Sequence, residues 1–327
     1  MKVLENISLK SYTTFGIDVK ARRMLVLEPG DELSGILNEQ NGKCLLLGGG
    51  SNMVFTKDYD GTVITLSNTN YSPLTTLRSP LVTVWGGMVM DDLIQWTLDN
   101  GLYGHENLSA IPGTVGASAV QNVGAYGAEA KDFIESVEAY DLQEQRLCAF
   151  SNADCRFAYR DSFFKHHPGR YLILRVTYRL STTFMPNLSY KALVDLPHDS
   201  AQQLRQSIID LRWQKLPRPE EYGSAGSFFK NPVVDEPTYL RLKSEYPDMP
   251  DAHNVGSEYK LSAGWLIDKA GWKGRIQGRA GVWPKNALVL YNAGGCTGDE
   301  VVALAKSIQN DVKQKFGIPL EPEAIII

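Results

Sequence analysis

A short apolar run, Cys44–Leu47, leads directly into the glycine-rich segment Gly48-Gly49-Gly50-Ser51-Asn52. Glycines after a buried strand let backbone N–H groups converge on an anion, because no Cβ blocks the approach. The segment lacks the Lys-Ser/Thr ending of a Walker A loop. The residues that follow, 53–61, are typical of a strand and a turn, whereas a Rossmann fingerprint requires a helix there. Alone, the three glycines fit a tight structural turn better than a ligand site.

The second glycine-rich segment, 111–127, holds four glycines and three alanines, so few of its side chains can fill space. Such a run is expected where another body, such as a pyrophosphate and an isoalloxazine ring, occupies the space. Gln121 and Asn122 supply the few polar groups that a mostly apolar cofactor pocket needs. A tightly packed turn is the alternative. The two segments together predict these cofactor-binding residues: Gly48, Gly49, Gly50, Ser51, Asn52, Ile111, Pro112, Gly113, Thr114, Gly116, Ala117, Gln121, Asn122, Gly124 and Tyr126.

Two cations, Arg212 and Lys215, lie near the end of a helix that the pattern places at 200–216. Ser200 and Gln203 form a capping-box pattern, apolar residues recur one turn apart, and Pro217 ends the helix. The two side chains could serve equally as partners of the helix dipole or as ligands for a phosphorylated substrate.

The elements that must position these residues suggest an α+β fold. Short apolar and β-branched runs predict strands at 44–47, 62–66, 81–85, 136–141 and 171–180, with one helix at 91–98 capped by Asp91 or Asp92. After a proline-rich boundary at 217–223, helices are expected at 235–246 and 262–270 and a strand at 287–291. The clearest helix begins at the capping box of Thr297 and Glu300 and ends at Gly317.

Composition excludes several classes of function. The 327 residues carry a formal net charge of −4, which argues against a broad nucleic-acid surface. The sequence has neither a secretory signal nor an apolar run long enough to span a bilayer, so we expect a cytoplasmic protein with no membrane contact. The four cysteines are widely spaced and form no metal-binding pair, which predicts reduced thiols and no metal site.

Seven segments occur in an order that resembles the UDP-N-acetylenolpyruvoylglucosamine reductases, and they span essentially the whole chain. Two of them are the glycine-rich segments described above. The others are Tyr12-Thr13-Thr14-Phe15-Gly16-Ile17, Tyr159-Arg160-Asp161-Ser162, Lys215-Leu216-Pro217, Gly223-Ser224-Ala225-Gly226-Ser227-Phe228-Phe229-Lys230-Asn231-Pro232 and Leu320-Glu321-Pro322-Glu323. The segment around Tyr190 resembles the tyrosine-bearing insertion of the longer subtype of this family.

The resemblance implies an FAD-binding fold of the vanillyl-alcohol-oxidase type, with two lobes and a third α+β domain for the substrate. The implied boundaries are 1–66 with a C-terminal return at 318–327 for the first lobe, 67–216 for the second, and 217–317 for the substrate-binding domain. It also implies reduction of an enolpyruvyl ether in cell-wall precursor synthesis. NADPH would reduce FAD, and hydride would pass from flavin N5 to C3 of the substrate. We expect a monomer whose partners are small molecules.

Three catalytic residues are implied by the resemblance: Arg160, Ser227 and Glu323. Arg160 would stabilise the developing enolate, Ser227 would protonate C2, and Glu323 would polarise the enol or relay a proton. Considered alone, Arg160 fits an ion pair with Asp161 or another acid. Ser227 likewise fits a turn serine, and Glu323 an exposed tail residue.

Substrate binding would fall to cations, aromatics and amides: Tyr190, Arg212, Lys215, Asn231, Lys260 and Asn286. Lys215 could also meet the NADPH phosphate. The sequence departs from the family in two places. Ala252 and His253 stand where a tyrosine is common, and segment 282–287 lacks a histidine, so recognition of the uridine is less defined than the chemistry.

Two other functions fit parts of the sequence. An oxidase of sugar lactones or hydroxy acids would share the fold, but such enzymes often attach flavin through a histidine or cysteine in the first glycine-rich segment, and this one has neither. A flavin-binding or nucleotide-sugar-binding sensor would need no catalytic residues. The simultaneous presence of Arg160, Ser227 and Glu323 disfavours it.

Overall fold

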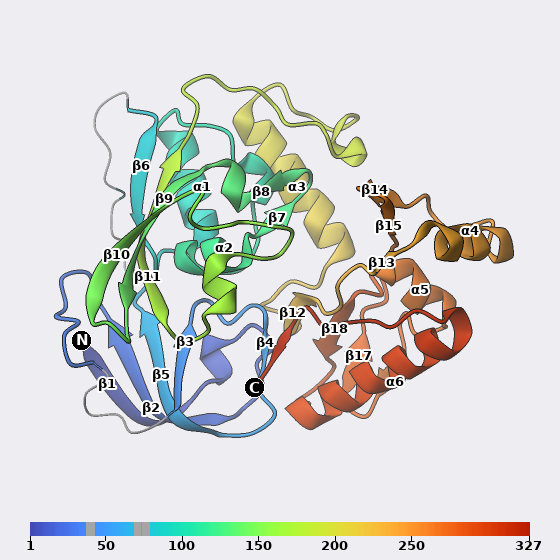
Figure 1. Cartoon of the computed structure of the whole chain (residues 1–327), viewed down its shortest axis with the longest axis horizontal. Helices are drawn as coiled ribbons and strands as arrows, with labels where there is room; N and C mark the ends of the chain where they lie inside the picture. The colour runs from blue at the N-terminus through green and yellow to red at the C-terminus, as the bar shows by residue number, and fades with distance from the viewer. Residues whose placement is uncertain (37–42, 69–72, 74–78) are drawn as a thin grey trace. The chain divides into compact units, whose positions relative to one another are not determined.

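The computed structural model describes residues 1–36, 43–68, 73 and 79–327 (Figure 1). The chain forms two compact units, and each is assembled from separate stretches of sequence. The first unit comprises Met1–Ile7, Ala21–Gly49 and Tyr59–Arg212. The second comprises Ser8–Lys20, Gly50–Asp58 and Trp213–Ile327.

The first unit contains two four-stranded sheets. One has the order β1 (Lys2–Ser8), β2 (Lys20–Leu27), β5 (Tyr59–Leu66), β3 (Lys43–Leu47), and β5 pairs in parallel with both β2 and β3. The other has the order β10 (Arg146–Ser151), β9 (Ile134–Asp141), β11 (Tyr171–Arg179), β6 (Leu81–Trp85) and is antiparallel. Residues 61–65 are all buried, as expected for a central strand in a parallel arrangement.

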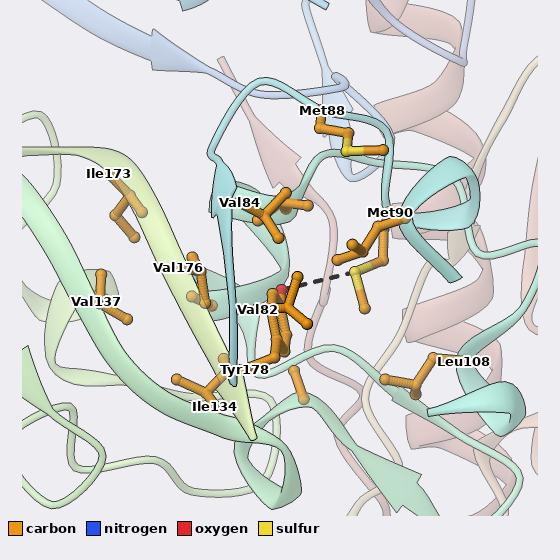
Figure 2. Packing of buried hydrophobic residues seen from close by; sticks show 14 of the residues in the cluster. Val82, Val84, Met88, Met90, Leu108, Ile134, Val137, Ile173, Val176 and Tyr178 are labelled. Carbon is orange, nitrogen blue, oxygen red and sulfur yellow. Dashed lines mark hydrogen bonds between the residues drawn. The ribbon is translucent and has the colours of Figure 1, made fainter. Parts of the chain in front are cut away.

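The helices α1 (Met90–Asp99) and α2 (Val115–Gln121) pack with the antiparallel sheet. Figure 2 shows Val82 of β6 and Val176 of β11 within this core, and the Tyr178 hydroxyl donates to the Met90 sulfur at 3.7 Å. Tyr178 is fully buried. A second cluster joins the two sheets through Leu25, Leu27, Ile36, Ile64, Trp85, Tyr140, Leu142, Leu172 and Leu174.

The first unit also contains most of α3 (Ala201–Lys215), whose Leu204, Ile208 and Leu211 pack together as the helical spacing predicts. Its remaining elements are short: η2 (Glu106–Leu108), β7 (Gly124–Ala125), β8 (Ala128–Glu129), η3 (Ala130–Asp132), η4 (Phe163–His166) and η5 (Lys191–Leu193).

The second unit is built on the sheet β12 (Ser224–Ser227), β18 (Val289–Asn292), β17 (Ala280–Val282), β16 (Ile276–Gln277). The helix α6 (Gly298–Phe316) contacts β17 and α5 (Ala263–Lys269). A small sheet of β13 (Val233–Val234), β15 (Glu258–Lys260) and β14 (His253–Val255) contacts α4 (Glu236–Glu245). The parallel pair β4 (Met53–Val54) and β19 (Ile325–Ile326) and the short η1 (Lys10–Tyr12) complete it.

Most of the predicted elements are confirmed. Thr297 and Glu300 form a reciprocal capping box, and Gly317 ends α6 with φ of 74°. Two expectations were wrong. Neither Asp91 nor Asp92 caps α1, whose N-cap residue is Val89 without a side-chain cap. The strand β5 begins at Tyr59, inside the stretch expected to form a turn. No helix in the described part of the chain is long and apolar enough to span a membrane.

Candidate active site

The two glycine-rich segments meet in the first unit. A Cβ on Gly48 would lie 2.7 Å from the Ala117 Cβ, and a Cβ on Gly49 would lie 2.8 Å from the Gly113 Cα. Real Cβ atoms do not approach other heavy atoms so closely, so these two glycines are required for the contact. The strand β3 ends directly before Gly48, so the position of β3 sets where the first segment contacts the second.

The second segment is not a continuous loop, because α2 forms inside it. The Thr114 side chain caps this helix by accepting from the Ala117 N–H at 3.4 Å, and Asn122 ends it with φ of 44°. A Cβ on Gly116 would lie 3.2 Å from the Gly86 carbonyl oxygen. Close helix–sheet packing thus accounts for some of the small residues that the sequence assigned to a ligand-filled space.

The side chain of Asn122 fixes the local backbone. It donates to the Ala158 carbonyl at 2.8 Å and to Glu129 at 3.1 Å, and it accepts from the Lys131 N–H at 3.0 Å. These three bonds use most of the capacity of one amide group. Asn122 therefore anchors the chain just before Arg160.

Arg160 adopts a left-handed backbone conformation, with φ of 54°, in a tight turn where Ala158 and Asp161 are hydrogen bonded to each other. Its guanidinium donates to the Gly124 carbonyl, and a Cβ on Gly124 would lie 2.9 Å from Arg160 Nη1. Asp161, the ion-pair partner considered from the sequence, contacts His166 at 2.8 Å. The arginine is half-buried and fixed against the second glycine-rich segment.

Three residues expected to bind ligands form a cluster in the first unit. The rings of Tyr126 and Tyr190 meet edge to face at 5.2 Å, and Tyr126 is hydrogen bonded to Arg212. Burial raises the pKa of Tyr126 and lowers the pKa of Arg212, while their mutual interaction opposes both shifts. Arg212 is only 8% exposed, so it is more than a solvent-facing partner of the helix dipole. Lys215 is exposed.

The tyrosine-bearing insertion packs onto the second glycine-rich segment. A Cβ on Gly127 would lie 2.0 Å from the Ser189 hydroxyl. The Asn107 amide donates to the carbonyls of Tyr126 and Asn187 at 2.8 and 2.9 Å. Asn107 thus holds the insertion and the segment together, a role that no sequence motif signalled.

In the second unit, Ser227 ends β12 opposite Val289 of β18. The next residue, Phe228, donates its N–H to the Leu288 carbonyl at 2.7 Å and accepts from the Glu323 N–H at 2.8 Å. Phe228 and Phe229 are 0% and 1% exposed, which anchors the backbone on which the half-buried Ser227 sits. The structure therefore brings the segments of Ser227 and Glu323 together.

Glu323 is half-buried rather than an exposed tail residue. Its carbonyl accepts from the Asn52 amide at 3.2 Å, and Phe229 forms an isolated antiparallel bridge with Pro322. The neighbouring acid Glu321 is exposed and pairs with Lys230 at 3.3 Å. The two glutamates thus lie in different settings, and the catalytic role of Glu323 stays a prediction.

The segment Thr13–Gly16 supports the serine strand from the N-terminal part of the second unit. The Thr14 hydroxyl donates to the Ser224 carbonyl at 2.6 Å, and the Ser224 N–H donates to the Thr14 carbonyl at 3.1 Å. A Cβ on Gly223 would lie 2.2 Å from the Phe15 carbonyl oxygen, which explains the glycine there.

The remaining expected substrate residues have identifiable structural settings. Asn231 accepts from the Ala263 N–H at 3.0 Å, Asn286 accepts from the Leu288 N–H at 3.1 Å, and Lys260 pairs in register with Val233 and His253. His253 is exposed. Their contacts with a substrate remain predictions.

An ion pair that no sequence motif indicated supports the start of the second glycine-rich segment. Arg205 of α3 contacts Asp91 of α1 through two hydrogen bonds of 2.6 and 3.0 Å, and Asp91 also accepts from the Ala110 N–H at 2.6 Å. Despite burial, these bonds lower the pKa of Asp91. Asp91, which was predicted to cap α1, therefore connects α1 with α3 and with the loop at Ala110.

The residues present fit FAD. The two glycine-rich segments meet with only small side chains between them at Gly48 and Gly49, an arginine is fixed beside the second segment, and aromatic and polar groups adjoin it at Tyr126. Residues 31–146 match the family described as FAD binding domain. These features define the class of protein: an FAD-binding flavoprotein with an α+β fold, as the sequence predicted.

The C-terminal part identifies the family. Residues 218–327 match the C-terminal domain of UDP-N-acetylenolpyruvoylglucosamine reductase. The chain is 43% identical to the reductase of this name from Pseudomonas aeruginosa, over 99% of this chain and 98% of that protein, and 42% identical to that of Pseudomonas putida, over 98% and 97%. The chain belongs to the UDP-N-acetylenolpyruvoylglucosamine reductase family, and it is an oxidoreductase of peptidoglycan synthesis.

A solved structure supports the fold independently. The crystal structure of UDP-N-acetylenolpyruvylglucosamine reductase from Thermus caldophilus superposes with a TM-score of 0.72 at 24% identity, covering 100% of this chain and 99% of that one.

Proposed function

We propose that this protein reduces the enolpyruvyl ether of UDP-N-acetylglucosamine to the lactyl ether of UDP-N-acetylmuramate, with NADPH as the reductant. Hydride adds to C3 and a proton adds to C2 of the enolpyruvyl group, so one NADPH and one proton are consumed for each double bond. Bound FAD supplies the hydride chemistry, and the protein supplies orientation and electrostatics. The single observation that carries this proposal is the hydrogen-bonded pairing of the Ser227 and Glu323 segments in a chain of this family.

Arg160 would bind the substrate carboxylate and stabilise the negative charge that develops on its conjugated system. A guanidinium offers donors in a fixed fork, which suits two carboxylate oxygens. Its attachment to the Gly124 carbonyl supports this role, because a pre-oriented donor loses little freedom when the charge develops.

Ser227 would donate its hydroxyl proton to C2. An alkyl hydroxyl is a weak acid, so this step requires a strongly basic acceptor such as an ester-like carbanion. The buried pair Phe228 and Phe229 supports the role by fixing the adjacent backbone. Glu323 would polarise the enol or relay the proton that restores Ser227.

The UDP-sugar would be bound by the residues that the resemblance implies. Tyr190 and Arg212 are the best supported, because they cluster with Tyr126 beside the second glycine-rich segment. The other proposed contacts are Lys215, Asn231, Lys260 and Asn286, and Lys215 could also bind the NADPH phosphate. We further propose a cytoplasmic monomer divided at the three boundaries expected from the sequence.

Anaerobic absorbance measurements on the purified protein test the proposal. We expect the visible spectrum of bound flavin, loss of that spectrum with NADPH, and its return when the UDP-enolpyruvyl sugar is added. A flavoprotein that NADPH bleaches but the sugar does not reoxidise would be an oxidase or a sensor. NADH in parallel assays measures the preference between the two reductants.

A further inference from the structure

Asn52 bonds the C-terminal segment through both its side chain and its backbone. The side-chain amide donates to the Glu323 carbonyl at 3.2 Å, and the Asn52 carbonyl accepts from the Ile325 N–H at 2.9 Å. The parallel pairing of Ile325 with Met53 and of Ile326 with Val54 continues this contact. The last residue of the first glycine-rich segment therefore anchors the backbone on both sides of Ala324.

The same stretch is also held from the opposite direction. The Glu323 N–H donates to the Phe228 carbonyl at 2.8 Å, and the Lys230 N–H donates to the Glu321 carbonyl at 2.9 Å. Glu323 thus has its N–H bonded to the Ser227 segment and its carbonyl bonded to Asn52. Both partners lie in the second unit with it.

This double attachment matters because Glu323 lies in no helix or strand, so hydrogen bonds to other segments fix its backbone. The side chain of Asn52 contributes directly to holding the Glu323 carbonyl. Without this bond, the peptide that follows Glu323 keeps the longer 3.4 Å bond from the Ala324 N–H to the Phe228 carbonyl, so we expect the peptide to shift and the carboxylate to move with its backbone.

We propose that Asn52 is a positioning residue for the Glu323 carboxylate, in addition to any contact that it makes with FAD. The proposal rests on the role assigned to Glu323 under the proposed function. It predicts a specific loss in the half-reaction that reduces the substrate, because only that step uses Glu323.

Thr56 offers a matched control. Its hydroxyl donates to the Ile327 carbonyl at 2.8 Å, so it also bonds the C-terminal segment from the flank of β4, but away from Glu323. Asn52→Ala and Thr56→Val each remove one side-chain bond to a main-chain carbonyl of the same segment. Asn52→Asp provides a second variant, with the same shape and no donating N–H, should the alanine variant fold poorly.

The experiment compares four quantities in the wild type and these variants: flavin bound per chain, the rate of flavin reduction by NADPH, the rate of reoxidation by the UDP-enolpyruvyl sugar, and amide exchange at Glu323 and Ile325. For Asn52→Ala we expect reoxidation to slow about 10- to 100-fold, since displacement of a catalytic group by about 1 Å has effects of this size. In the flavin-loaded protein, reduction by NADPH should slow far less than reoxidation, and amide exchange at Glu323 and Ile325 should accelerate. Thr56→Val should leave both half-reactions near wild type.

Two results would overturn the proposal. Equal slowing of reoxidation in Asn52→Ala and Thr56→Val would mean that general anchoring of segment 323–327 matters. Equal slowing of both half-reactions in flavin-loaded Asn52→Ala would mean that Asn52 acts on the cofactor instead. A wild type that NADPH reduces but the sugar cannot reoxidise would refute the proposed function itself, and amide exchange would then still report whether Asn52 anchors Glu323.

Discussion

The Glu323 N–H donates to the carbonyl of Phe228, the residue directly after Ser227, at 2.8 Å. This bond joins the proposed proton donor to the proposed acidic partner through only one intervening residue. Both segments belong to the second unit, whereas Arg160 belongs to the first. The two residues proposed for proton transfer thus lie on hydrogen-bonded segments, and the guanidinium of Arg160 is held separately by the carbonyls of Gly124 and Asn122.

Ser227→Ala should leave bound flavin and its reduction by NADPH unchanged. Reduction of the enolpyruvyl sugar should slow by about 10²- to 10⁴-fold, the usual contribution of a general acid. Stopped-flow measurement of each half-reaction separates the two effects. Ser224→Ala in the same strand is the control and should retain activity. Full substrate turnover by Ser227→Ala would remove the serine from the mechanism.

Glu323→Gln should slow reoxidation of the flavin by the substrate, while Glu321→Gln should not. Glu321 pairs with Lys230 on the surface, with 74% of its side chain exposed, and exposed pairs contribute little. We expect a loss of about 10-fold or more for Glu323→Gln, within the range of a proton-transfer group. Equal effects of the two substitutions would point to charge at the chain end rather than to one carboxylate.

Gly49→Ala should weaken FAD binding and destabilise the first unit. Its Cβ would lie 2.8 Å from the Gly113 Cα, and neither backbone can yield without separating the two segments. The cost of such overpacking is roughly 1–3 kcal/mol. Thermal unfolding and flavin titration measure both losses. In Gly264→Ala the added Cβ would be 3.4 Å from Leu288 Cγ, an ordinary contact in a helix, so this control should keep its flavin.

Asp91→Asn should destabilise the protein by roughly 2 kcal/mol, because it leaves the guanidinium of Arg205, 10% exposed, without its charged partner. Flavin affinity should also fall, since Asp91 holds the Ala110 N–H at the start of the second glycine-rich segment. Asp92→Asn removes the neighbouring, exposed acid from the same helical turn and is the control. Urea unfolding that gives equal stabilities for the two variants would contradict the assigned role of the pair.

His105 should make stability depend on pH. Burial, with a smaller contribution from Arg205, lowers its pKa from 6.5 to about 3. The unfolded chain therefore takes up a proton that the folded protein does not. The stabilisation that neutral His105 provides is complete above pH 6.5 and decreases as the pH falls toward 3. Over this range the free energy of unfolding falls by about 1.4 kcal/mol per pH unit.

His105→Gln provides the measurement, because it retains a polar side chain facing Thr97, which lies 2.8 Å from the histidine ring. Between pH 7 and pH 5, the free energy of unfolding should fall by about 2 kcal/mol more in the wild type than in the variant. Comparison with the variant isolates the histidine, since the neighbouring Glu106 is present in both proteins. A difference that does not change with pH would mean that His105 titrates normally.

Local sequence determined the secondary structure wherever periodicity and capping agree. The helix α6 could be placed from Thr297, Glu300 and Gly317, because these residues satisfy the backbone groups at its own ends. The helix α2 could not. Its short run of small residues is held by the Thr114 cap and by packing on the sheet at Gly116, which sequence periodicity does not reveal.

For the site, the two glycine-rich segments, the three proposed catalytic residues and the family could be predicted from the sequence, because short motifs can be recognised from the order of their residues alone. Tertiary structure decided what those residues contact. Asp91 is the partner of Arg205 rather than a helix cap, and the side chain of Asn122 anchors the Arg160 turn. The side-chain amide of Asn52 donates a hydrogen bond to the Glu323 carbonyl. Hydrogen bonds between residues far apart in the chain depend on how strands and loops meet in space. The first glycine-rich segment could thus be recognised from its residue types, but its hydrogen bond to the Glu323 main-chain carbonyl could be found only in the folded structure.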